Sequence, residues 1–233
     1  MMPSEKIIHQ NIFVSDEERK KYFANLFYYL MNIDPIEYKF ITDQINSTDY
    51  NNIFISSDLH FLRDDVSIDM KKIENHNKTI KNNSIWIYLG DLGHKRNDNA
   101  KLLKSYVTKM NKGKFSIMII GNHDIYGKSF YKEECGFSYV CRGFIFNNIV
   151  FTHIPIKPDK LIKNNYSYNI CGHLHDKYNI FEYAQLYPEF KEIIDKELIY
   201  KYKIIYNKNN DWRPFSLDYI LNNKEVKIIP AHG

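Results

Sequence analysis

Five short clusters of residues that can bind metal ions or transfer protons follow one another through this 233-residue chain. In order they are Asp58-x-His60, Gly90-Asp91, Gly121-Asn122-His123-Asp124, His153 and Gly172-His173-x-His175. Each comes directly after a short apolar run of the kind that forms a buried strand. A single cluster of this kind is common by chance, because an isolated histidine on a strand is usually a core or surface residue. Five in succession, holding five of the nine histidines, indicate one site.

The side chains of these clusters determine the class of metal that would bind. Seven of them offer oxygen or nitrogen and none offers a thiolate: Asp58, Asp91, Asn122, His60, His153, His173 and His175. Such donors suit Mn, Fe, Zn or Ni and argue against a structural zinc site built on cysteine. Seven ligands are too many for one tetrahedral ion. They are enough for two divalent ions that share one bridging carboxylate.

The clusters must be positioned by alternating strands and helices. Apolar runs at 53–57, 85–89 and 115–120 predict strands. Helical patterns lie between these strands. The residues that recur on one face are Met70, Ile73, Asn77 and Ile80 in the first pattern, and Leu102, Leu103, Tyr106, Val107 and Met110 in the second. Strands that alternate with helices predict a mostly parallel sheet. In such a sheet, ligands bind beyond the carboxyl ends of the strands, which is where the clusters lie.

The segments before and after this alternating region follow other patterns. Runs at 143–146 and 149–152 flank Asn147-Asn148 and predict a hairpin, and further strands are expected at 168–171 and 201–206. We therefore expect a second, partly antiparallel sheet packed on the first. The first ~50 residues read as helical. One helix follows a capping box at Ser15, and another starts at Asp34-Pro35 with Ile36, Phe40, Ile41 and Ile45 on one face. This part is a packing layer or, alternatively, a cap that gates substrate.

Composition excludes several classes of protein. Hydrophobic residues make up 44% and charged residues 26%, as in ordinary globular proteins. Three cysteines without a C-x-x-C pair argue against a disulfide framework and favour a cytoplasmic setting. We expect no signal peptide and no membrane helix, because the apolar runs fall far short of the ~20 residues a span needs. The net charge of +4 is spread without a dense basic block, which disfavours a nuclease for long polymers but does not exclude nucleic acid.

The order of the clusters resembles the calcineurin-like metallophosphoesterase superfamily, whose motifs run D-x-H, G-D, G-N-H-[D/E], H and G-H-x-H. All five are present in order across residues 58–175, and the segment DWRPFSLD at 211–218 resembles the closing segment of small bacterial and phage-type members. The resemblance implies an α/β fold, a four-layer α/β/β/α sandwich. We accordingly divide the chain into a helical N-terminal extension at 1–50, packed on the core, and a metallophosphoesterase domain at 51–233.

The resemblance also implies roles for individual residues. The implied ligands are Asp58, His60 and His175 for the first ion, Asn122, His153 and His173 for the second, and Asp91 as the bridge. His123 would face the substrate and supply a proton or a positive charge to the phosphoryl group, and Asp124 would orient its ring. The implied reaction is attack by a hydroxide that bridges two ions ~3.5–4 Å apart. Manganese is the favoured metal, with iron, zinc or nickel as alternatives.

The motifs do not specify the substrate. We expect a small phosphorylated substrate, a nucleotide-like phosphodiester, because the N-terminal helices and the stretch 176–198 could roof the cleft. A phosphomonoesterase or protein phosphatase is the alternative. A metal-bound interaction module without catalysis is disfavoured, because all seven ligand positions and His123 are intact. Arg63, His94 and Arg96 are candidates for contact with phosphate, against the alternative that they lie on wet surface loops.

Overall fold

The first of two sheets carries most of the predicted clusters. The computed structural model describes residues 17, 26, 28–30, 33–94, 99–174, 198–205, 212–224 and 227–228. The strands of the first sheet are β1 (Ile53–Ser56), β2 (Ile85–Tyr88), β3 (Phe115–Ile119), β4 (Tyr139–Cys141) and β9 (Phe215–Ser216). They lie in the order β4-β3-β2-β1-β9, and only β9 is antiparallel to its neighbour. The carboxyl ends of β1, β2 and β3 therefore meet at one edge.

The second sheet contains the predicted hairpin. Its strands are β5 (Gly143–Phe146), β6 (Ile149–Thr152), β7 (Tyr168–Cys171), β8 (Tyr202–Ile205) and β10 (Lys227–Ile228), in the order β10-β8-β7-β6-β5. β5 and β6 are antiparallel and the other pairs are parallel. Asn147 and Asn148 turn the hairpin with positive φ angles of 45° and 62°, a conformation that asparagine tolerates well. The hairpin and the partly antiparallel sheet are confirmed.

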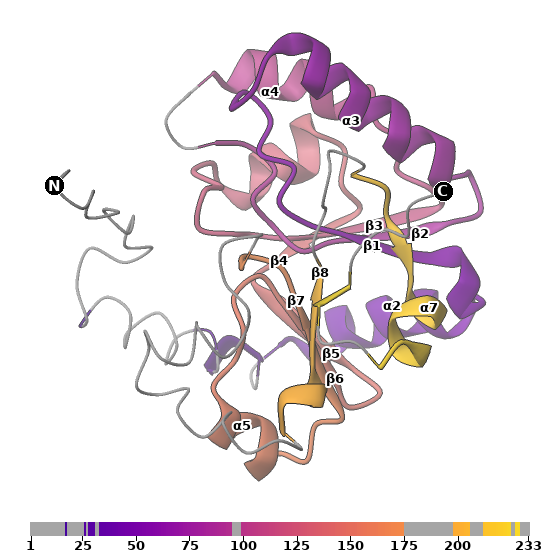
Figure 1. Cartoon of the computed structure of the whole chain (residues 1–233), viewed down its shortest axis with the longest axis vertical. Helices are drawn as coiled ribbons and strands as arrows, with labels where there is room; N and C mark the ends of the chain where they lie inside the picture. The colour runs from indigo at the N-terminus through magenta and orange to yellow at the C-terminus, as the bar shows by residue number, and fades with distance from the viewer. Residues whose placement is uncertain are drawn as a thin grey trace, which may run out of the picture.

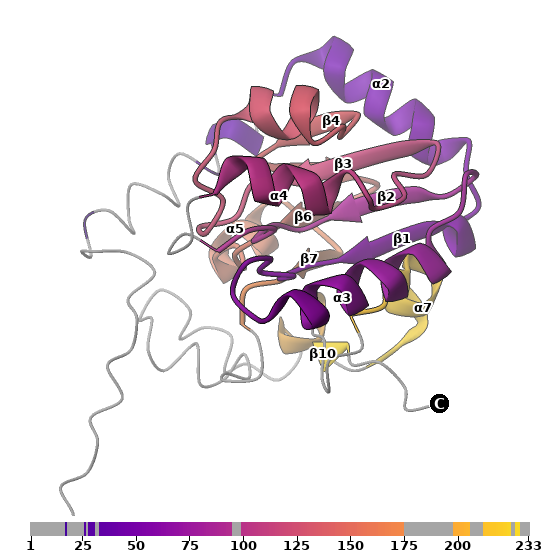
Figure 2. The ribbon, with the colours of Figure 1, turned by 90° about the horizontal axis from the view of Figure 1, so that it is seen from above.

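Helices cover both outer faces of the paired sheets. α3 (Val66–Thr79) and α4 (Ala100–Val107) lie on the first sheet, and α5 (Pro158–Lys163) lies on the second (Figures 1 and 2). α2 (Pro35–Asn46) and α7 (Leu217–Asn222) contribute to the core between the sheets. Shorter helices span Tyr50–Asn52, Phe130–Glu134 and Leu198–Lys201. This α/β/β/α arrangement confirms the predicted fold class.

The central strands are apolar along their whole length because both of their faces are buried. In β2, Ile85 and Ile87 point into the core between the sheets, while Trp86 and Tyr88 point toward α3 and α4. All four side chains are fully buried. A parallel strand covered on both sides has this composition, whereas a strand with one wet face alternates between polar and apolar residues.

Three predicted helix faces differ from the structure. In α4, Leu102 belongs to the predicted apolar face but is 38% exposed. In α2, Ile41 and Ile45 are buried, but Ile36 and Phe40 are 80% and 51% exposed, because the helix presents only a narrow stripe to the core. In α3, Met70 is 39% exposed, and the buried positions include polar residues that pair with one another. Most of the predicted helix after Ser15, and most of the stretch 176–198 that we expect to roof the cleft, lie outside the described residues. The boundary at residue 50 stays a prediction. Within the described part of the chain, no helix is long and apolar enough to span a membrane.

Adjacent leucines in α4 provide a matched test of the outer core. Leu103 is 2% exposed and packs against Gly93, whereas Leu102 is 38% exposed. We expect Leu103→Ala to lower the free energy of unfolding by about 2–5 kcal/mol, because it leaves a cavity beneath α4. Leu102→Ala should change it by about 0.5 kcal/mol. Urea denaturation of both variants checks this, and equal effects would contradict the orientation that α4 has in the structure.

His76 gives the fold a specific sensitivity to acid. Its ring is buried against Trp86 at 4.3 Å, its Nε2 contacts the Asn111 carbonyl at 2.8 Å, and burial lowers its pKa to about 4. Between pH 6.5 and 4 the unfolded chain therefore binds more protons than the folded one, so stability falls as pH falls. His76→Gln keeps a donor toward Asn111 and does not titrate. We expect the wild type to lose about 3 kcal/mol more than this variant between pH 7 and pH 4, measured by denaturation.

Candidate metal centre

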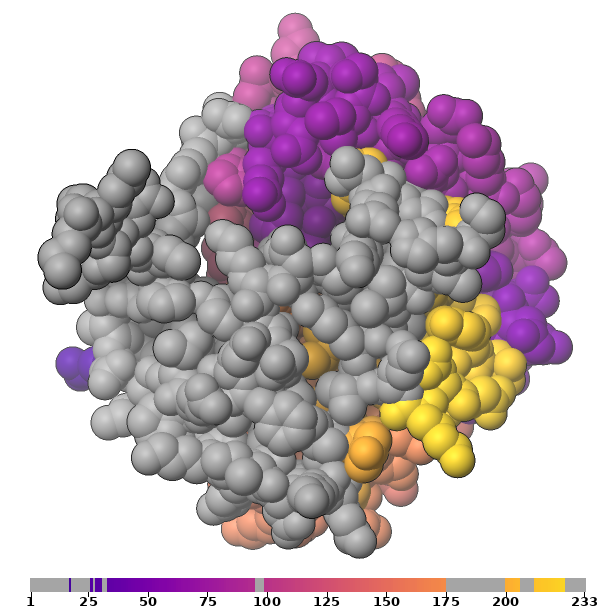
Figure 3. All heavy atoms as spheres, viewed as in Figure 1, coloured from indigo at the N-terminus to yellow at the C-terminus, as the bar shows by residue number. Residues whose placement is uncertain are grey.

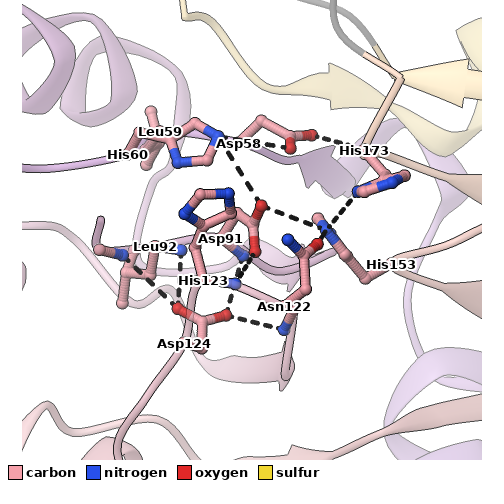
Figure 4. Close-up of polar contacts among 12 residues, drawn as sticks. Asp58, Leu59, His60, Asp91, Leu92, Asn122, His123, Asp124, His153 and His173 are labelled. Carbon is pink, nitrogen blue, oxygen red and sulfur yellow. Dashed lines mark hydrogen bonds and ion pairs between the residues drawn. The ribbon is translucent and has the colours of Figure 1, made fainter. Parts of the chain in front are cut away.

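The predicted clusters meet where the carboxyl ends of strands from both sheets face one another (Figure 4). Asp58 and His60 follow β1, Asp91 follows β2, and the Asn122–Asp124 turn follows β3. From the second sheet, His153 follows β6 and His173 follows β7. Arg63 and His94 lie on loops after the first two strands. His175 and Arg96 lie outside the described residues.

The carboxylate of Asp91 lies between two sets of histidines. Its Oδ2 atom is 3.3 Å from His153 Nε2 and 3.7 Å from His60 Nε2. Its Oδ1 atom accepts the backbone N–H of His123 at 2.8 Å. Asp91 Oδ2 is buried and accepts no hydrogen bond of good geometry, although His153 Nε2 is close enough for an ion pair. A buried carboxylate oxygen is stable only beside positive charge, so this atom is suited to bind a cation.

On one side of Asp91, four atoms that can donate an electron pair converge. His153 Nε2 lies 2.9 Å from Asn122 Oδ1, 3.2 Å from His173 Nδ1 and 3.3 Å from Asp91 Oδ2. His153 Nδ1 lies 2.8 Å from the Leu89 carbonyl, which can only accept, so Nδ1 carries the proton. In the neutral imidazole, Nε2 is then the atom that binds metal. The backbone carbonyl of Leu89, directly after β2, thus selects the tautomer, as the outer partners of metal-binding histidines do.

On the other side of Asp91 lie Asp58 and His60. His60 Nε2 is 3.8 Å from Asp58 Oδ1. The second oxygen of Asp58 accepts the backbone N–H of His173 at 3.0 Å, so this carboxylate also joins the two sheets. His60 therefore faces both Asp58 and the Asp91 oxygen that faces His153.

The electrostatics of the site favour charged forms. Burial alone raises the pKa of Asp91, but His153, His60 and His123 outweigh it and hold the pKa well below its usual range. Burial likewise lowers the pKa of His153, but the Asp91 carboxylate more than offsets this and raises it to about 9. The site thus stabilises negative charge on Asp91 by positive charge around it, and divalent cations are suited to the same role.

Asp124 ties the loops of the site together. Its Oδ2 accepts backbone N–H groups from Asp91 and Gly121, both at 2.8 Å, and its Oδ1 accepts that of Leu92 at 2.9 Å. Burial and the nearby charge of Asp91 raise its pKa to about 6. Asp124 therefore fixes the turn that carries His123. A direct role in orienting the His123 ring stays a prediction.

The backbone at the site is strained. Four residues at predicted ligand positions have left-handed φ angles: Asp58 (58°), His60 (44°), Asp91 (59°) and His173 (70°). Non-glycine residues rarely adopt this conformation, which costs on the order of 1–3 kcal/mol each when it is strained. The space at Gly121 is also restricted, because a Cβ there would collide with the Asp91 carboxylate. The close turn after β3 therefore requires glycine.

Tyr88 is a contributor that sequence reasoning missed. Its hydroxyl accepts the Leu59 N–H at 2.9 Å and donates to the Asp91 carbonyl at 3.0 Å, so it joins the loops after β1 and β2. The sequence did contain a sign of this role, because a tyrosine follows isoleucine and tryptophan residues in the predicted strand IWIYLGD. A buried tyrosine needs a partner for its hydroxyl, and here both partners are backbone atoms of the site.

Three imidazole rings form the side of the site away from His153. The His123 ring lies 4.9 Å from both the His60 ring and the His94 ring, and the His60 and His94 rings are 5.7 Å apart. His94 is half-buried and therefore reaches the site rather than standing free on a loop. Arg63 is exposed, and its backbone N–H donates to the His60 carbonyl at 3.2 Å.

Two groups of possible ligands can be assembled from the described residues, and both contain Asp91. One is His60, Asp91 and His123; the other is Asp91, His153 and His173, with ligand atoms within 4.8 Å of one another in each group. The residues present therefore fit divalent ions. The first group differs from the set that the sequence implied, since it holds His123 instead of Asp58.

Comparison with known proteins identifies the family of this chain and a structure that is similar to it. The model of the calcineurin-like phosphoesterase family matches residues 52–232. A crystal structure of a protein of unknown function from Aquifex aeolicus is similar, with 21% identity and a TM-score of 0.49, covering 72% of this chain and 96% of that chain. No curated protein matches the chain.

Metal stoichiometry separates the ligands from their neighbours. If Asp91 bridges two ions, Asp91→Ala should lose both, because each ion loses a charged ligand. If His123 contacts substrate instead of metal, His123→Ala should still hold two. Asp159→Ala, at a carboxylate that is 54% exposed, is the control. Elemental analysis of Mn²⁺-loaded, desalted protein measures this, and loss of one ion in His123→Ala would make His123 a ligand.

Proposed function

Because the chain belongs to the calcineurin-like phosphoesterase family, we propose that it is a two-metal hydrolase for a small, nucleotide-like phosphodiester. The observation that carries this proposal is Asp91 Oδ2, a buried carboxylate oxygen that faces histidines on both sides. A carboxylate in that position can serve two ions at once. The choice of a small substrate rests on the scattered basic residues, which offer no dense block for a long polymer.

The proposed ligands divide between the two sides of Asp91. Asp58, His60 and His175 would hold one ion, and Asn122, His153 and His173 the other. Manganese is the proposed metal for both, with iron, zinc or nickel as alternatives that the same nitrogen and oxygen donors accept. When bound, two such ions supply Lewis acidity toward the phosphoryl oxygens and a lowered pKa for water.

The side chains of the chain itself would orient the substrate and move a proton. The His123 imidazole is proposed to face the phosphoryl group and to protonate the leaving oxygen, or to stabilise charge on the phosphoryl oxygens. Its position is supported from two sides, since its backbone N–H donates to Asp91 and Asp124 clamps its turn. The His94 ring beside it and the Arg63 guanidinium are proposed to bind the phosphate and so set its orientation.

Paired chromogenic substrates test the proposal. We expect metal-stripped protein reloaded with Mn²⁺ to hydrolyse bis-p-nitrophenyl phosphate, and His123→Ala to lower kcat by about 10²–10⁴-fold with two ions retained, because it removes the general acid. Steady-state kinetics with Asp159→Ala as control measures this. Faster turnover of p-nitrophenyl phosphate would make the protein a phosphomonoesterase. No turnover of either ester by protein holding two ions would contradict a broad phosphoesterase and favour an interaction module.

His94 and Arg63 should affect binding more than the chemical step. Each would contribute one contact to a charged phosphate, so His94→Ala and Arg63→Ala should raise KM by about 10-fold. The same kinetic series measures both variants. A change in kcat alone would argue that neither residue binds the phosphate in the ground state.

A further inference from the structure

A cluster of buried charges lies beneath the loop that follows His60. Lys72 and Asp69 of α3 are each 1% exposed. The Lys72 ammonium lies 2.8 Å from Asp69 Oδ1 and 2.9 Å from Asp64 Oδ2. Burying an ion pair costs more in desolvation than packed apolar side chains do, so stability alone is a poor explanation for it. The two contacts that the cluster makes with the loop offer another explanation.

The cluster binds the loop at two nearby residues, Leu62 and Asp64. Asp69 Oδ2 accepts the Leu62 N–H at 2.9 Å, and Leu62 has a left-handed φ of 70°, which is unfavourable for a leucine. Asp64 belongs to the loop itself and is bound through Lys72. The cluster thus fixes the backbone at 62 by a hydrogen bond and the side chain at 64 by an ion pair.

Aromatic rings enclose the ammonium group of Lys72. It lies 5.8 Å from the centroid of the Phe61 ring and 5.2 Å from that of Trp212. Such contacts are favourable for a desolvated cation. Trp212 comes from the segment that leads into β9, and β9 pairs with β1, the strand that precedes the site. Lys72 is therefore held between the loop and a second segment attached to the same strand.

The loop passes this constraint on to the metal centre. The Phe61 N–H donates to the Leu92 carbonyl at 2.8 Å, and the Arg63 N–H donates to the His60 carbonyl at 3.2 Å. His60 itself is in a strained conformation with a φ of 44°. A strained residue keeps its position only when its surroundings hold it there. The loop on one side and β1 on the other provide that constraint.

We infer that Lys72, Asp69 and Asp64 form a charged brace that positions the His60 ring for the first metal ion and the Arg63 side chain for the substrate. These three are positioning residues, since their contacts reach the site only through the loop 61–64. The inference rests on the proposed function for the roles of His60 and Arg63. It assigns a purpose to α3, which lies on the outer surface of the molecule (Figure 3).

The test replaces the two buried charges of the brace, at Lys72 and Asp69, by neutral side chains of similar size and leaves the partly exposed Asp64 in place. Lys72→Met with Asp69→Leu removes both buried charges together, so that neither is left unpaired. Lys72→Met with Asp69→Asn keeps an acceptor for the Leu62 N–H and serves if the first pair does not fold. Lys78 and Glu74 form an exposed ion pair of 2.7 Å on the same helix, and Lys78→Met with Glu74→Gln is the matched control.

Two measurements report on the brace. In Mn²⁺ titrations by calorimetry, we expect the Met/Leu pair to weaken one of two binding events by about 10-fold or more and to leave the other unchanged. The loss should disappear in a His60→Ala background and persist in a His173→Ala background. Hydrogen exchange of the peptide that contains Leu62 should become faster in the Met/Leu pair and stay unchanged in the control pair. The Met/Leu pair should also have a higher KM, because Arg63 would no longer be positioned to bind the substrate.

Three results of the titration would overturn the inference. The first is a folded brace variant whose Mn²⁺ affinity is unchanged. The second is an equal loss of affinity in both binding events, and the third is a loss of affinity that persists in the His60→Ala background. Wild-type protein that holds two ions but hydrolyses no ester would refute the proposed function and leave the titration interpretable. If wild type binds no Mn²⁺, the function is wrong, and unchanged exchange at Leu62 would then overturn the brace as well.

Discussion

The arrangement of this site depends on two buried carboxylates, Asp91 and Asp124. Asp124 is satisfied by backbone N–H groups at the ends of β2 and β3, so it holds the two strand ends together. Asp91 turns one oxygen toward His123 and the other toward His60 and His153. Two negative charges so close in a buried site repel each other. Positive charge around Asp91 is therefore a condition for this arrangement, and histidines and divalent cations are suited to provide it.

The sheets make that arrangement rigid. Left-handed backbone at Asp58, His60, Asp91 and His173 would not persist in a free loop, because each position is unfavourable by itself. Here the N–H of Asp58 donates to Gly90 at 3.0 Å and that of His60 donates to Asp91 at 3.0 Å. The ladder between β1 and β2 thus continues past the strand ends and holds the ligands in place. The charged brace, which joins α3 to the loop after His60, extends the same constraint to the outside of that loop.

The sequence predicted the strands well and the helix faces less well. Continuous apolar runs mark strands that are buried on both sides, and the run 168–171 coincides with β7. Helical periodicity shows that a face exists, but not how wide it is. Four residues were placed on buried faces and are exposed: Ile36, Phe40, Met70 and Leu102. α3 instead buries Lys72, which no apolar pattern reveals, because its partner Asp64 lies in the preceding loop and Trp212 comes from the far end of the chain.

The sequence by itself determined which donor atoms are available and in what order, since residue types and strand ends are local properties. It also determined the family, because five spaced motifs are specific together. Only the tertiary structure decided which oxygen of Asp91 faces the histidines, which nitrogen of His153 contacts the Leu89 carbonyl, and that the Tyr88 hydroxyl joins two loops. These are contacts between residues that are distant along the chain. They depend on how the strands are placed side by side, and residue spacing alone does not specify that placement.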